Sequence, residues 1–111
     1  MTSKSPLALA CSLSPGAYAD RLREFRRLFA AALRESRREP ACLHLVLDAS
    51  ITQEEVVHDL LRREQECCPF FTFVVEATEG ALRVQAAVPE GAGECLDDLE
   101  RMAARALARR A

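Results

Sequence analysis

The sequence predicts an α+β domain: a two-layer sandwich in which three helices cover one face of a four-stranded mixed sheet, in the order β-α-β-α-β-β-α. Two observations indicate it. Segments with alternating apolar residues, typical of strands, are interleaved with segments that repeat apolar residues at helical spacing. In addition, the second to fourth expected strands each have one strongly apolar face, which favours helices on one side only. We expect residues 1–6 to form a flexible tail and residues 7–111 a single globular domain.

Composition restricts the classes of function. The chain has 111 residues, half of them apolar, with a net charge of −2, so bulk charge does not favour a nucleic-acid partner. No apolar run approaches the roughly 20 residues of a membrane span. Residues 7–11 are too short an apolar segment for a lipoprotein signal, so we expect a cytoplasmic protein with reduced thiols. An odd number of cysteines, five, also argues against a complete disulfide framework.

The first half of the chain is expected to form a strand, a helix and a second strand. The strand covers residues 7–13, and Ser14-Pro15 then begins a helix that runs to about Arg38. Residues 42–47 alternate as the second strand. The helix carries seven arginines, which we interpret as a solvated face with local acidic partners, because no aromatic or glycine pattern of a nucleic-acid surface accompanies them.

The second half is expected to contain a helix, a hairpin and a final helix. Residues 52–55 form a capping box, and Pro69 ends the helix that follows it. Residues 71–75 and 82–88 should pair antiparallel around a turn, and the last helix starts near Glu94. Because helices connect the first three strands, we expect these strands to be parallel to one another.

Two adjacent cysteines, Cys67 and Cys68, lie at the expected helix-to-strand corner. Glu64 precedes them by three and four residues, which places its carboxylate on the same side of the helix as both sulfurs. Adjacent thiolates can chelate soft ions such as Cu(I), Zn(II), Hg(II), Cd(II) or As(III). The alternative is that the cysteines are small buried residues at a helix end and that Glu64 reaches solvent or pairs with an arginine.

Three further cysteines are candidates for a third donor or a separate pair. Cys95, in the first turn of the last helix, should reach the same end of the sheet as the corner, where a helix N-terminus would stabilise its thiolate. Cys11 should lie nearer the opposite end. Cys42 and His44 share one face of their strand and could be two metal ligands, although such a pair is more often a coincidence.

The segment from Glu64 to Phe73 resembles the signature of small bacterial proteins with a Glu-x-x-Cys-Cys-x-Phe core. Proteins of this kind are encoded among mercury and other heavy-metal resistance functions, and similar segments extend MerR-type regulators. The likeness includes the opening Cys-Ser-Leu at residues 11–13 and the Leu-His-Leu strand at residues 43–45. It implies soft-metal handling by Glu64, Cys67 and Cys68, with Cys11 as a further ligand. The sequence shows no helix-turn-helix pattern, so we do not expect a complete regulator.

These observations predict a small cytoplasmic protein that binds a soft metal ion, most of all Hg(II), for sequestration or relay and without an organic cofactor. One alternative is a thiol enzyme, an organomercurial lyase or a reductase, with Cys67 or Cys68 as nucleophile and Glu64 as acid. Another is an interaction module that pairs through the open sheet face, which is also the candidate surface for a homodimer. We expect neither a nucleic-acid nor a membrane partner.

Overall fold

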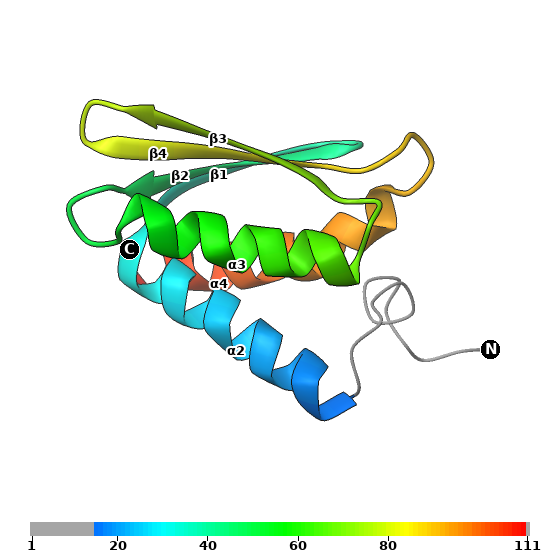
Figure 1. The fold of residues 1–111 in the computed structure, drawn as a ribbon. Coiled ribbons are helices and arrows are strands. Elements are labelled where there is room, and N and C mark those ends of the chain that lie inside the picture. Colours follow the sequence, from blue (N-terminus) through cyan, green and yellow to red (C-terminus); the bar gives the residue numbers. More distant parts are fainter. Residues whose placement is uncertain (1–14, 111) are drawn as a thin grey trace.

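A computed structural model describes residues 15–110 and shows the helices on one side of a four-stranded sheet (Figure 1). The α+β class and the two-layer arrangement are therefore confirmed. The elements follow one another as α2 (Pro15–Ala32), β1 (Leu33–Glu39), β2 (Cys42–Asp48), α3 (Glu54–Cys67), β3 (Thr72–Thr78), β4 (Ala81–Ala87), the short 3₁₀ helix η1 (Gly93–Leu96) and α4 (Asp97–Arg110).

The sheet is built from two hairpins joined side by side. Its strand order is β1-β2-β4-β3, and each neighbouring pair is antiparallel. Strands β3 and β4 pair from Thr72 opposite Ala87 to Thr78 opposite Ala81, which confirms the predicted hairpin. Gly80 turns the chain there with a φ of 76°, a conformation that favours glycine.

The first helix is shorter than predicted. It ends at Ala32, and the segment expected to continue it to about Arg38 is strand β1. The physical reason is that residues 34–39 contain no apolar side chain that a helix could bury, whereas an edge strand needs only backbone pairing and tolerates charge. Strands β2 and β3 run in the same direction, as expected, but they are not paired: β4 lies between them and is antiparallel to both. The sheet of the described residues is therefore antiparallel and not mixed as predicted. The predicted strand at residues 7–13 lies outside the described residues.

The core lies between the sheet and the helices. Leu43, Leu45 and Leu47 point into it from β2, as the alternation predicted, while Cys42 and His44 face the open side of the sheet and are half-buried. The other strands and the helices contribute Phe25, Phe29, Leu33, Val57, Leu60, Leu61, Cys68, Phe71, Leu82, Val84, Ala86, Leu96, Leu99 and Ala103. Within residues 15–110, no helix has both the length and the apolar composition needed to cross a bilayer.

The turn between β1 and β2 packs tightly against the start of η1. A Cβ atom added to Gly93 would lie 2.3 Å from the carbonyl oxygen of Pro40, and the Arg38 guanidinium donates to the Gly93 carbonyl oxygen at 2.8 Å. Glycine is therefore required at position 93 by the close approach of two backbone segments.

We predict that Gly93→Ala lowers the free energy of unfolding by about 1–3 kcal/mol, because the new methyl group forces the two segments apart. Urea unfolding followed by circular dichroism measures this change. The matched control is Gly16→Ala in α2, where nothing lies within 4 Å of the added Cβ atom, and which should stabilise by up to about 1 kcal/mol. Equal effects at both positions would contradict the packing described here.

Candidate functional site

Helix α3 ends at the cysteine pair. Cys67 is its last residue, and Cys68 follows with a non-helical backbone while its N–H still donates to the Glu64 carbonyl oxygen at 2.8 Å. Pro69 comes next and cannot continue the helix. The predicted helix end within a residue or two of Cys68 is thus confirmed.

The two thiols lie in different surroundings. Cys68 is fully buried and belongs to the hydrophobic core, whereas Cys67 is half-buried and packs against the edge of that core. Neither forms a disulfide bond with another cysteine of residues 15–110. Among residues 15–110, Cys67 is therefore the more accessible cysteine of the pair.

A buried ion pair holds a positive charge beside Cys67. Arg21 of α2 and Glu64 of α3 are only 8% and 3% exposed, and Arg21 Nη1 donates to Glu64 Oε1 at 2.8 Å. The other guanidinium nitrogen, Nη2, donates to Cys67 Sγ at 3.8 Å. Burial alone would lower the pKa of Arg21, but the contacts with Glu64 and Cys67 outweigh it and raise the pKa above its ordinary value. Arg21 is thus a permanent cation whose guanidinium donates to the Cys67 sulfur.

Glu64 is linked to the Cys67 thiol through Arg21. Its carboxylate lies inside the protein and accepts a hydrogen bond from the Arg21 guanidinium, so the alternative that Glu64 pairs with an arginine is confirmed. Sequence analysis missed Arg21, which it assigned to the solvated face of the first helix. The missed signal is spacing: Arg21 stands three residues after Tyr18 and four before Phe25, inside the apolar stripe of α2.

A second ion pair reinforces the contact between α2 and α3. Arg63 donates through both terminal nitrogens to the Glu24 carboxylate, at 2.7 and 2.9 Å, and also contacts Asp59. The hydrogen bonds from Arg63 lower the pKa of Glu24 despite its partial burial, and the pKa of Arg63 is raised by the same contacts. These long side chains fix α2 relative to α3 at the level of Arg21.

The other predicted donors do not complete a ligand set in the described part of the chain. Cys95 lies in η1 and is buried, and this burial, together with the neighbouring Glu94 and Asp97, raises the pKa of its thiol. These influences oppose the stabilisation of its thiolate that was expected from a helix N-terminus. Within residues 15–110, Glu64, Cys67, Cys68 and Cys95 supply no three ligand atoms lying within 4.8 Å of one another. Cys11 lies outside the described residues.

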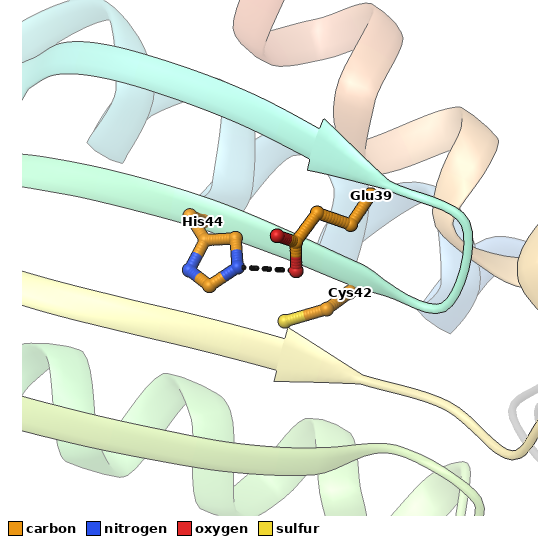
Figure 2. A group of neighbouring side chains, drawn as sticks. All are labelled: Glu39, Cys42 and His44. Atoms are coloured by element: carbon orange, nitrogen blue, oxygen red, sulfur yellow. Dashed lines mark hydrogen bonds and ion pairs between the residues drawn. The ribbon is translucent and has the colours of Figure 1, made fainter.

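A different group of side chains could hold a metal ion. Glu39, Cys42 and His44 place one ligand atom each within 4.8 Å of the other two, on the open face of the sheet (Figure 2). His44 Nε2 lies 2.9 Å from Glu39 Oε1. Burial and the nearby Glu39 charge raise the pKa of the Cys42 thiol. The sequence indicated the Cys42 and His44 pair but not Glu39, because the strand that carries it was expected to be helix.

Comparisons with known protein families, with curated proteins and with solved structures give no match to this chain. The functional argument therefore rests on the chemistry of the two groups of side chains. One group is the corner, defined as Arg21, Glu64, Cys67 and Cys68. The other is the open-face triad, defined as Glu39, Cys42 and His44.

We predict that Glu64→Leu lowers the free energy of unfolding by about 3–5 kcal/mol, because it leaves the Arg21 charge buried without its partner. Adding Arg21→Met should restore more than half of this loss, since the double variant replaces both charges by apolar groups. Urea unfolding measures all three proteins. Glu66→Leu, which removes the exposed partner of Arg62, is the control and should cost less than about 1 kcal/mol. A loss below 1 kcal/mol for Glu64→Leu would show that the ion pair is not buried in solution.

Proposed function

We propose that the protein is a small cytoplasmic binding protein for a thiophilic metal ion such as Hg(II), which it holds through Cys67 and Cys68 for sequestration or relay. The observation that carries this proposal is the buried Arg21 guanidinium, which joins Glu64 to the Cys67 sulfur. The ion pair with Glu64 offsets the cost of burying this arginine, and its second terminal nitrogen donates to the Cys67 sulfur. The adjacent Cys68 supplies a second soft donor.

Charge balance favours a divalent ion held by two thiolates. The charges of Arg21 and Glu64 already cancel within the buried pair. Two thiolates and a divalent cation also cancel, so the loaded corner would carry no net charge in a low-dielectric environment. Hg(II), which accepts two ligands, suits this donor set better than a structural zinc ion, which prefers four. Cu(I) also accepts few ligands, but with two thiolates it would leave one negative charge on the corner. As(III) would need a further thiolate, for which Cys11 and Cys95 are the candidates.

Uptake would proceed in two steps because the thiols differ in access. The half-buried Cys67 would bind the ion first, with loss of its thiol proton to solvent. Cys68 would then replace a small-molecule ligand on the same ion once the last turn of α3 opens, again releasing one proton. Arg21 would accompany the negative charge on Cys67 during this exchange. Helix ends open more readily than helix centres, so the position of Cys68 after α3 suits this sequence.

The same corner leaves a thiol enzyme as the alternative function. A cation beside Cys67 would also serve a nucleophile that attacks a disulfide or an organomercurial. The role of acid assigned to Glu64 is less well supported, because Arg21 engages its carboxylate. We therefore favour binding over turnover. Product formation from an organomercurial or a disulfide would favour the enzyme over the binding protein. If the protein showed neither metal uptake nor turnover, the remaining function would be that of an interaction module.

We predict that the reduced protein keeps one equivalent of Hg(II) in the presence of excess monothiol, because only a chelating thiol pair competes with free thiols. Equilibrium competition followed by native mass spectrometry measures the affinity and the stoichiometry. Cys67→Ser combined with Cys68→Ala should weaken retention by about 100-fold or more, the gain typical of joining two binding groups. Alanine is used at position 68 because Cys68 lies in the hydrophobic core, where burial of a serine hydroxyl is costly.

Three single variants serve as controls in the same competition. Cys42→Ser should leave retention unchanged, because Cys42 lies on the opposite face of the sheet. Cys11→Ser and Cys95→Ser identify any third donor, and only the residue that binds the ion should weaken retention. If the Cys67/Cys68 double variant retains Hg(II) as tightly as the parent while remaining folded by circular dichroism, the proposed function is wrong.

A further inference from the structure

We propose that the open-face triad of Glu39, Cys42 and His44 is a second and independent site, which binds a divalent cation of the Zn(II) class and closes the turn between β1 and β2. The inference does not rest on the corner. It uses other residues, another face of the sheet and another class of ion.

The hairpin itself brings the three side chains together. Glu39 and Cys42 are paired across the turn formed by Pro40 and Ala41, and His44 follows Cys42 by two residues along β2. Residues two apart on a strand point to the same face. Figure 2 shows the carboxylate, the sulfur and the imidazole gathered above that face. The site thus depends on a local strand pairing rather than on a distant contact.

The spacing of the donor atoms fits a small cation. A tetrahedral zinc ion with bonds of about 2.0–2.3 Å separates its ligand atoms by about 3.3–3.6 Å. The three donors here lie within 4.8 Å of one another, and His44 Nε2 lies 2.9 Å from Glu39 Oε1. Binding would replace this hydrogen bond by two bonds to the metal. Side-chain shifts of about 1 Å complete the geometry.

Arg37 orients the carboxylate without blocking it. Its Nη1 atom donates to Glu39 Oε2 at 2.8 Å and leaves Oε1 for the cation. Ligating carboxylates commonly carry such an outer hydrogen bond. The Arg37 side chain is 64% exposed, so water screens its charge from an incoming cation.

The mixed donor set selects the class of ion. One thiolate, one imidazole and one carboxylate suit Zn(II) or Co(II), whereas Mg(II) and Ca(II) prefer oxygen donors alone and Hg(II) prefers paired thiolates. Three protein ligands leave a fourth position for water or a small ligand. His44 also lines a hollow of about 400 Å³ on the open face, so such a ligand has room to enter.

The sheet separates this site from the corner. Leu43, Leu45 and Leu47 of β2 face the core that contains Cys68, while Cys42 and His44 face away from it. Each site can therefore be removed without touching the other.

Titration of the reduced, metal-free protein with Co(II) alone tests the proposal. We expect one equivalent to give the visible bands of four-coordinate cobalt and a thiolate-to-cobalt charge-transfer band. Cys42→Ser should remove the charge-transfer band. His44→Gln should weaken binding by about 100-fold or more, because loss of a ligand costs at least as much as loss of a residue that only orients one. His58→Gln is the matched control, because His58 Nε2 lies 3.0 Å from Glu54 Oε2 in an exposed pair without a thiol. The His58→Gln variant should keep both the cobalt spectrum and the Co(II) affinity of the parent.

The corner variant separates the two proposals. Cys67→Ser with Cys68→Ala should leave the cobalt spectrum intact even though it loses Hg(II) retention. The inference is overturned if the parent shows no charge-transfer band, if the band survives Cys42→Ser, or if the corner variant abolishes it.

Discussion

The arrangement of the corner depends on the buried ion pair between Arg21 and Glu64. It links the first turns of α2 to the end of α3 and places Arg21 Nη2 beside Cys67 Sγ. Such a pair adds little net stability, because desolvation offsets most of the attraction, and an apolar pair of the same size would pack as well. What the pair adds to the corner is therefore a charged hydrogen-bond donor next to the Cys67 sulfur rather than net stability.

The sheet divides the sulfur chemistry of the molecule into two settings. On the helical side, Cys67 and Cys68 border the apolar core with a fixed cation nearby, which suits a soft ion held by few ligands. On the open side, Cys42 stands with a carboxylate and an imidazole within reach of solvent, which suits a harder divalent ion. A domain of this size can thus contain two sets of metal ligands, one of sulfur alone and one of mixed sulfur, nitrogen and oxygen. The two sets differ because the two faces of the sheet differ in burial and in neighbouring residues.

Local chemistry explains what the sequence could predict. Pro69 ends α3 through its own backbone geometry, and Gly80 favours a hairpin turn for the same kind of local reason. The corner and the β3–β4 pairing were therefore predictable. Strand β1 was not predictable, because its charged residues also suit a helix and only pairing with β2 makes them a strand. The error concealed Glu39 and, with it, the open-face triad.

The ion pair at the corner could have been predicted by comparing the apolar stripes of the two helices. Arg21 and Glu64 each interrupt the apolar stripe of an otherwise amphipathic helix, and opposite charges on two core-facing stripes are expected to meet. What the sequence could not supply is the third contact, from Arg21 to Cys67, since it depends on how α2 crosses the end of α3.

The most direct test of this account is the position of mercury in a crystal of the reduced protein loaded with one equivalent of Hg(II). Anomalous scattering locates the ion independently of any assumption about its ligands. The account predicts a single strong peak bonded to the sulfurs of Cys67 and Cys68, next to the Arg21 guanidinium. A peak at Cys42 or Cys95 with no mercury at the corner would contradict it.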